Sequence, residues 1–195
     1  MQKIVVPEHI KGLIFDCDGT LVDSMPMHMK AWEYAITHFG APWNHDFIFS
    51  QKGVPSTDIV ELYNQEFLVS LDTNRVSDMK QEYFKRFYNE TKVIQPVVDI
   101  VFRYNGILPM SVASGGSREN VHAQLDVVGL TKYFPIILTA SDDIKPKPAP
   151  DLFLEAARLM NVPPHLCQVF EDGDLGLEAA EKAGMLATDV RGYEG

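Results

Sequence analysis

The chain has few basic residues, only two cysteines and no long apolar segment. Its 17 lysines and arginines stand against 27 aspartates and glutamates, which gives a formal net charge of −10. This charge disfavours nucleic acid or an anionic membrane surface as the main partner. It also repels phosphorylated ligands at long range. Any phosphate site would therefore need local positive charge or a metal ion.

The scarcity of cysteine and of targeting signals indicates a reducing compartment. Cys17 and Cys167 lie in apolar, strand-like runs, where buried reduced thiols are the simplest interpretation. The first residues mix Lys3, Glu8 and Lys11 with valine and isoleucine, unlike a signal peptide. No segment has the pattern of a transmembrane helix. We therefore expect a cytoplasmic protein, and we expect it to be a monomer.

The first half of the sequence predicts one buried strand followed by helices. The 195 residues are 46% hydrophobic and 23% charged, as in a globular domain that can carry a modest insertion. A continuous apolar run predicts a buried strand at residues 12–15, and an edge strand is expected at 4–6. Residues 21–91 then show helical patterns and no convincing strand. The expected helices lie between Ser24 and Gly40 and at about 44–51, 56–69 and 76–91.

From Pro96 onward the expected elements alternate between helix and strand. Helices are predicted near 96–104, 117–128, 150–160 and 175–183, and strands at 110–113, 135–138, 167–170 and 186–190. Repeated units of this kind predict a doubly wound parallel sheet, to which the first strand also belongs. We predict an α/β fold: a Rossmann-like sheet of five main strands, formed by residues 1–20 and 92–195. An all-helical cap, residues 21–91, would be inserted after the first strand.

Two carboxylates follow the first strand. The apolar run at 13–15 stops at Asp16, and Asp18 follows two residues later. This spacing lets both side chains face one cleft, where they would repel each other unless a cation lay between them or one were protonated. Mg²⁺ prefers such hard oxygen ligands, while Gly19 permits a sharp turn and Thr20 adds a hydroxyl. An isolated pair of this kind is more typical of an ordinary turn.

Polar residues also follow the other predicted strands. Residues 114–117 (SGGS) precede a helix, where they could bind an anion or only cap the helix. Lys147 lies in a proline-rich loop, which would order it beside a phosphate, although isolated lysines are usually solvated. Glu171 and Asp172 could complete an oxygen-rich metal cage with Asp16. In open α/β sheets ligands bind at the carboxyl ends of strands, which is where these residues are expected.

Together these motifs resemble the haloacid dehalogenase superfamily of phosphotransferases, and specifically its branch of β-phosphoglucomutases and sugar-phosphate phosphatases. The matching segments are DCDGTLVDS at 16–24, Ser114 after VA, KPAPDLF at 147–153 and EDGDLG at 171–176. Each motif alone is weak, but four in the same order are specific. The resemblance spans nearly the whole chain, including the position of the cap.

The resemblance implies a role for each of these residues. Asp16 would be the nucleophile that forms an aspartyl-phosphate, and Asp18 would act as general acid and then as general base. Ser114 and Lys147 would hold the remaining phosphoryl oxygens. The implied ligands of a Mg²⁺ cofactor are Asp16, the backbone carbonyl of Asp18, Glu171 and Asp172.

In the same way, the resemblance assigns substrate recognition to the cap and to the turns around the site. The residues expected near a small phosphorylated sugar are Thr20, His28, Gly53, Ser56, Lys80 and Gly115. The loop at 52–57 corresponds to the specificity loop of the family. His28 could equally be a half-buried imidazole on a helix surface, and Lys80 could be an exposed helix lysine.

One position bears on the choice between hydrolysis and isomerisation. The mutases of this branch carry an arginine shortly after Lys-Gly-Val, and by unaligned count Ser56 stands there. A mutase must hold a bisphosphate by both ends, and serine contributes only a neutral contact. We therefore expect a Mg²⁺-dependent phosphohydrolase. The alternative is a β-phosphoglucomutase in which Lys80 or Arg118 replaces the arginine.

Two alternatives lie outside enzyme catalysis. A phospho-aspartate receiver is also doubly wound, but it lacks a cap and the Asp-x-Asp-Gly-Thr turn. A relative that only binds phosphosugars is the other possibility, and the intact Asp16, Asp18, Lys147 and Asp172 argue against it.

Overall fold

The computed structural model describes residues 4–193 and contains a five-stranded parallel sheet in the order β5-β4-β1-β6-β7. The strands are β1 (Gly12–Phe15), β4 (Met110–Ala113), β5 (Ile136–Leu138), β6 (Cys167–Glu171) and β7 (Leu186–Asp189). The central strand β1 is buried throughout, which explains its continuous apolar sequence. The predicted Rossmann-like α/β fold is confirmed, with each main strand within one or two residues of its expected bounds.

Helices cover both faces of this sheet. The flanking helices are α5 (Gln95–Tyr104) and α6 (Arg118–Val127) on one face, and α7 (Asp151–Met160) and α8 (Asp174–Lys182) on the other. Side chains of β1 alternate between the two cores: Leu13 and Phe15 join the first cluster, and Ile14 joins the second. Short 3₁₀ turns lie at Thr131–Tyr133 and Pro164–Leu166.

The register of the central strands brings their carboxyl ends level. Phe15 of β1 lies opposite Val112 of β4 and Phe170 of β6. The rings of Phe15 and Phe170 stack with centroids 4.7 Å apart, and the Asp16 amide donates to the Phe170 carbonyl at 3.0 Å. The residue after each strand therefore emerges at the same edge of the sheet.

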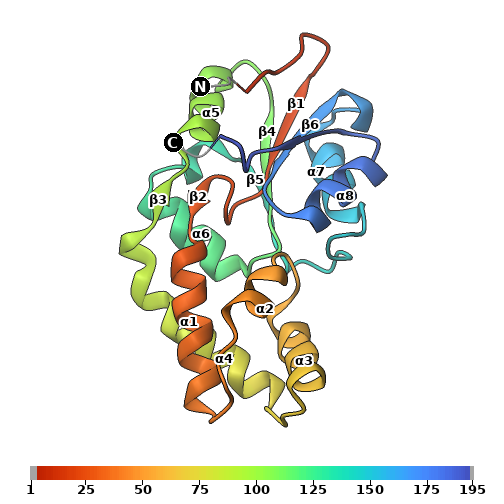
Figure 1. Ribbon diagram of the computed structural model, residues 1–195. Helices are drawn as coiled ribbons and strands as arrows, with labels where there is room; N and C mark the ends of the chain where they lie inside the picture. The colour runs from red at the N-terminus through yellow and green to blue at the C-terminus, as the bar shows by residue number, and fades with distance from the viewer. Residues whose placement is uncertain (1–3, 194–195) are drawn as a thin grey trace.

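Four helices lie beyond this edge, at the lower end of the molecule in Figure 1. They are α1 (Met25–His38), α2 (His45–Ser50), α3 (Ser56–Phe67) and α4 (Thr73–Phe84), and a 3₁₀ helix, Lys85–Glu90, continues α4. They enclose an apolar cluster of their own around Trp32, Tyr63 and Val76. The single helix expected at 76–91 is wrong in its bounds, because Asp72 caps an earlier start by accepting from the Arg75 amide.

Two strand predictions are also wrong. A two-residue antiparallel ribbon joins β2 (Val22–Asp23) to β3 (Lys92–Val93), where no strand was expected, because two residues are too few to show an alternating pattern. No strand forms at residues 4–6; instead the Val5 carbonyl accepts a hydrogen bond from Gln168.

The ribbon lies beside the predicted boundaries between the core and the helical segment, and the division into two units remains our proposal. The outermost predicted core residues, 1–3 and 194–195, lie outside the described part of the chain. Within residues 4–193, no helix combines the length and apolar character needed to cross a membrane.

Candidate active site

Three buried acids converge at the carboxyl edge of the sheet. Asp16 follows β1, Glu171 ends β6, and Asp172 comes next in the chain. One carboxylate oxygen from each lies within 4.8 Å of the others. The turn after β1 approaches them closely at Gly19, whose φ is 82° and where a Cβ would overlap the Asp172 carboxylate. Glycine is therefore required at this position.

Lys147 supplies positive charge to two of these acids. It comes from the loop before α7, its side chain is only 3% exposed, and its Nζ donates to Asp16 Oδ1 at 2.7 Å and to Glu171 Oε1. Burial opposes the charge, but the two carboxylates raise the pKa of Lys147 above its ordinary value. Lys147 is thus a fixed ammonium group and not a solvated surface lysine.

The acid cluster remains short of positive charge despite this contact. Burial, followed by repulsion from Glu171 and Asp172, holds the pKa of Asp16 well above its usual range, although Lys147 opposes the shift. Burial and Glu171 raise the pKa of Asp172 to about 6, while Lys52 lowers it. Hard oxygen donors that resist ionisation without a counter-ion suit a divalent cation. The donor set therefore fits the expected metal.

Asp18 is held by donors on one of its two oxygens. Its Oδ1 accepts from Ser24 Oγ at 2.5 Å and from Gln124 Nε2 at 3.0 Å, and lies 3.0 Å from His28 Nε2. Burial alone would raise the pKa of Asp18, but His28, Ser24 and Gln124 together lower it. Within residues 4–193, Oδ2 accepts no hydrogen bond, and Asp18 lines the central cavity.

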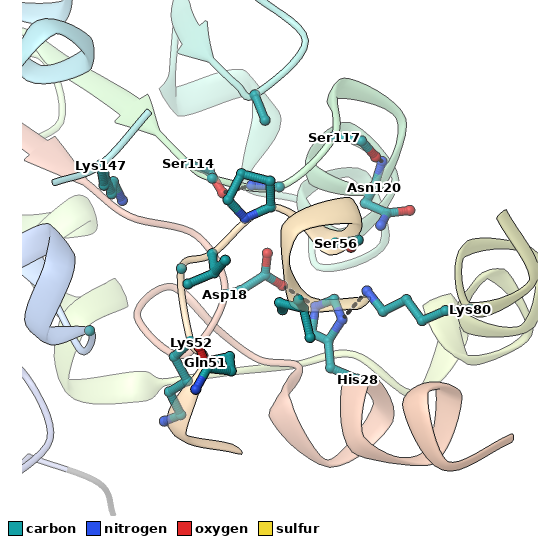
Figure 2. Close-up of a pocket in the computed structure, with 18 of the residues that line it drawn as sticks. Asp18, His28, Gln51, Lys52, Ser56, Lys80, Ser114, Ser117, Asn120 and Lys147 are labelled. Carbon is teal, nitrogen blue, oxygen red and sulfur yellow. Dashed lines mark hydrogen bonds and ion pairs between the residues drawn. The ribbon is translucent and has the colours of Figure 1, made fainter. Parts of the chain in front are cut away.

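A chain of side chains connects Asp18 to the helical segment, as Figure 2 shows. His28 of α1 stacks on Phe84 and places its Nδ1 3.0 Å from Lys80 Nζ of α4. Burial lowers the pKa of Lys80 to about 8, and burial together with Lys80 lowers the pKa of His28. A neutral His28 that accepts from Lys80 at Nδ1 and donates to Asp18 at Nε2 fits this geometry. Lys80 is 5% exposed, so the alternative of an exposed lysine is wrong.

The two serine hydroxyls of the loop before α6 make different contacts. Ser114 Oγ accepts from the Gly116 amide at 3.0 Å, which leaves its own hydrogen for an acceptor in the cavity. Ser117 caps α6 by accepting from the Asn120 amide at 3.4 Å, and it also receives Gln81 Nε2 from α4 at 2.9 Å. The helix-cap interpretation is confirmed for Ser117, and anion binding by Ser114 stays a prediction.

A cavity of about 380 Å³ lies between the strand ends and the helical segment. The predicted residues that line it are Asp16, Asp18, His28, Gly53, Ser56, Lys80, Ser114, Gly115, Lys147, Glu171 and Asp172. Thr20, expected near the substrate, does not line it; its hydroxyl is buried and points to Asp172 at 3.5 Å. Arg118 is also outside, because it is half-exposed and paired with Asp142 at 2.6 Å.

Several residues of the site were missed at the level of sequence. Lys52 pairs with Asp172 at 3.2 Å, and Gln124 contacts Asp18. The other missed residues that line the cavity include Gln51, Ser77, Gln81 and Asn120. Helical spacing could have found Ser77 and Gln81, because Ser77 lies three residues before Lys80 and four before Gln81. A glutamine between Val121 and Leu125 was the corresponding signal for Gln124.

The structure defines an α/β protein with a doubly wound parallel sheet and clustered carboxylates at the carboxyl edge of that sheet. A family model described as haloacid dehalogenase-like hydrolase matches residues 10–184. The chain therefore belongs to the haloacid dehalogenase-like hydrolase family and is an enzyme. This confirms the resemblance noted in the sequence and removes the phospho-aspartate receiver as an alternative.

Individual relatives lie in both candidate functional groups. The chain is 36% identical over 184 residues to the fructose-1-phosphate phosphatase YqaB of Escherichia coli (strain K12), covering 94% of this chain and 98% of the relative. It is 26% identical over 192 residues to the β-phosphoglucomutase of Bacillus subtilis (strain 168), covering 93% and 83%. The β-phosphoglucomutase structure from Clostridium difficile has a TM-score of 0.81 at 24% identity, covering 92% and 84%, which shows the shared fold.

Proposed function

We propose that the protein is a Mg²⁺-dependent phosphohydrolase that acts on small sugar phosphates through an aspartyl-phosphate. The observation that carries this proposal is the position of Asp16, which lines the cavity beside the buried ammonium of Lys147. A carboxylate there can attack a phosphoryl group whose negative charge Lys147 helps to balance. Similarity to the fructose-1-phosphate phosphatase of Escherichia coli supports a sugar phosphate as the substrate.

In the first step, a carboxylate oxygen of Asp16 forms a bond to phosphorus as the bond from phosphorus to the sugar oxygen breaks. Ser114 donates its hydroxyl hydrogen to a phosphoryl oxygen, and Asp18 gives a proton to the departing sugar oxygen. Asp18 is ionised in the free protein, so it must first gain that proton at Oδ2. A monoprotonated phosphate ester can deliver it.

In the second step, Asp18 takes a proton from water while the water oxygen attacks the phosphorus of the aspartyl-phosphate. The bond from phosphorus to Asp16 breaks, inorganic phosphate leaves, and the Asp16 carboxylate is restored. Asp18 then holds one proton, which it passes to the released phosphate or to solvent.

The metal in this proposal is Mg²⁺, held by Asp16, Glu171, Asp172 and the backbone carbonyl of Asp18. When bound, the ion would neutralise the clustered carboxylates and stabilise charge on the phosphoryl oxygens. The chemistry of three buried carboxylates supports this assignment.

The helical segment, residues 21–91, is proposed to act as a cap that excludes water and selects the substrate. His28, Gly53, Ser56 and Lys80 would contact the sugar from the cap, and Gly115 would contact it from the core. We further propose a monomer in the cytoplasm that binds neither nucleic acid nor membrane. The net charge of −10 supports the second part of this statement.

β-Phosphoglucomutase activity is the second candidate, and Lys80 is the observation that favours it. Its ammonium group is buried at the cavity, where it could hold a second phosphate. The same group, however, is engaged with His28, and Ser56 offers only a hydroxyl.

A phosphate-release screen against sugar phosphates tests the proposal. We expect turnover with Mg²⁺, none in excess chelator, and poor support by Ca²⁺, because Ca²⁺ takes more ligands at longer distances and misplaces the reacting groups. Full activity in chelator would contradict the metal assignment. Absence of phosphate release from every sugar phosphate would contradict the proposed reaction and substrate class.

A further inference from the structure

Helix α6 carries a polar side chain on its apolar face. Gln124 is completely buried, and its neighbours Val121 and Leu125 belong to the core beneath the sheet. A buried amide lowers the stability of a core unless both of its polar atoms find partners. Gln124 therefore requires a specific explanation.

Of the two polar atoms of the Gln124 amide, one has a hydrogen-bond partner in the described part of the chain. Its Nε2 donates to Asp18 Oδ1 at 3.0 Å, whereas its Oε1 has no hydrogen-bond partner within residues 4–193. Because a carboxylate can only accept, the contact with Asp18 also fixes which end of the amide faces it. An apolar side chain of similar length would fill the same space without an orphaned oxygen. What glutamine adds at this position is one donor aimed at Asp18.

The three groups that contact Asp18 Oδ1 come from two parts of the molecule. Ser24 precedes α1 and His28 lies within it, so both belong to the proposed cap. Gln124 belongs to α6, which packs against the sheet. Of the three, Gln124 alone would keep its place relative to Asp18 if the cap moved.

We propose that Gln124 is a positioning residue that fixes the orientation of the Asp18 carboxylate from the core side. By binding Oδ1 it keeps Oδ2 directed at the cavity, where the proton is transferred in both steps. This inference rests on the proposed role of Asp18 as general acid and base. Gln124 does not itself line the cavity, so it acts through Asp18 and not on the substrate.

The test compares leaving groups that differ in their need for a proton. Gln124→Met keeps the approximate length of the side chain and removes the donor. Under single-turnover conditions with Mg²⁺, we expect release of fructose from fructose 1-phosphate to slow by about tenfold, a part of the 10²–10⁴ that a general acid typically contributes. Release of p-nitrophenolate from p-nitrophenyl phosphate, which leaves without a proton, should slow by less than about twofold. An equal loss with both substrates would overturn the inference.

Gln168→Met is the matched control. Gln168 is another buried glutamine whose Oε1 lacks a partner in the described chain, but its Nε2 binds Val5 and Thr188 away from the cavity. This variant reports the general effect of replacing a buried amide on thermal stability. The ratio of the two release rates should stay at its wild-type value, and a changed ratio would show that the measurement reports packing, which would overturn the inference.

Asp18→Asn separates this inference from the proposed function. If Asp18→Asn slows both leaving groups equally, the general-acid role of Asp18 is wrong and the inference falls with it. If Asp18→Asn slows the release of fructose more than the release of p-nitrophenolate while Gln124→Met slows both equally, only the inference about Gln124 fails.

A crystal structure of Gln124→Met provides a readout that needs no turnover. We expect the Asp18 carboxylate to occupy more than one orientation, and an unmoved Asp18 would contradict the positioning role.

Discussion

Asp16 lies in a cluster of buried acids that has more carboxylates than neighbouring lysine ammonium groups. Lys147 contacts Asp16 and Glu171, and Lys52 contacts Asp172, so three carboxylates share two ammonium groups. In a medium of low dielectric constant, this imbalance favours a bound cation and disfavours the ionised acids without one. The acids to which we assign the chemistry and the metal therefore reduce the stability of the metal-free protein.

Replacement of Asp16 tests its role as the nucleophile. Asp16→Asn should abolish turnover, because an amide cannot attack phosphorus, while the fold is kept or slightly stabilised by the loss of one buried charge. Phosphate release and thermal unfolding measured on the same sample check both parts. A folded variant that retains about a tenth of the wild-type rate would exclude Asp16 as the attacking group.

Lys80 makes stability depend on pH in the alkaline range. Its folded-state pKa is about 8, below the ordinary value of 10.5, so between these values the unfolded chain binds more protons than the folded one. The free energy of unfolding should therefore rise with pH through this window, by up to about 3 kcal/mol. Below pH 8 the full penalty of a buried charged lysine is present.

The comparison variant for this prediction is Lys80→Met, which keeps the stem and removes the charge. Denaturant unfolding of both proteins from pH 7 to 10.5 should show the wild type gaining stability relative to the variant. A constant difference across this range would show that Lys80 is not buried as a charged group.

At the scale of elements, the tight junction between β6 and α8 controls the position of Glu171. Gly176 lies in the first turn of α8, and a Cβ there would overlap the Glu171 carboxylate. Alanine is normally favoured over glycine within a helix by about 1 kcal/mol. Here we expect alanine to lower the stability instead, because Glu171 would have to give up its contact with Lys147.

Gly176→Ala should therefore lower both the melting temperature and the rate of phosphate release. We expect the rate to fall by about tenfold or more, because a displacement of about 1 Å at a catalytic centre can cost about 10²-fold in rate. Glu178→Ala on the exposed side of the same helix serves as the control and should change neither by much. Wild-type activity in Gly176→Ala would mean that Glu171 can shift without consequence.

The elements that the sequence predicted well are those with long, simple patterns. The strands β1, β4 and β6 were visible as largely apolar segments, because strands buried on both faces need no alternation, and only Ser111 and Gln168 interrupt them before their ends. The helix between Ser24 and Gly40 was marked by Pro26 in its first turn and by a glycine with φ of 79° at its end. The two-residue strands β2 and β3 depend on pairing between distant segments, which no local pattern contains.

The candidate site divides in a similar way. Residues at strand ends, such as Asp16 and Asp172, could be predicted because the topology of a parallel sheet brings them together. Residues such as Lys52 and Gln124 reach the site by tertiary packing, and their roles depend on which helix face meets the cavity. The environment of Lys80 was undetermined for the same reason, since only the folded chain shows that it is buried.

At the scale of the whole molecule, the cavity lies between two parts of the chain that are far apart in sequence. The strand ends provide the acids and Lys147, while the helical segment provides His28, Ser56 and Lys80. Hydrogen bonds connect the two parts, from Gln81 to Ser117 and from Tyr88 to Asn120. This division supports our proposal that the core carries the chemistry and the cap selects the substrate.

The charge distribution in this cavity leads to a prediction that separates hydrolase from mutase. Among the described residues that line it, the cationic side chains are three lysines: Lys147 and Lys52 are bound to acids, and Lys80 is engaged with His28. A planar guanidinium could grip a second phosphate through two hydrogen bonds, whereas Ser56 offers one neutral hydroxyl. A bisphosphate should therefore leave the site before its other end can react.

We expect the protein, incubated with β-glucose 1-phosphate and Mg²⁺ but without a bisphosphate activator, to release inorganic phosphate faster than it forms glucose 6-phosphate. Both products can be measured in one time course, and Ser56→Arg should shift the ratio towards glucose 6-phosphate by restoring a bidentate grip. Arg118 is not expected to contribute, because it is held outside the cavity by Asp142. Isomerisation much faster than phosphate release in the wild type would identify a mutase. Lys80 would then be the group that holds the second phosphate, and Lys80→Met should abolish isomerisation.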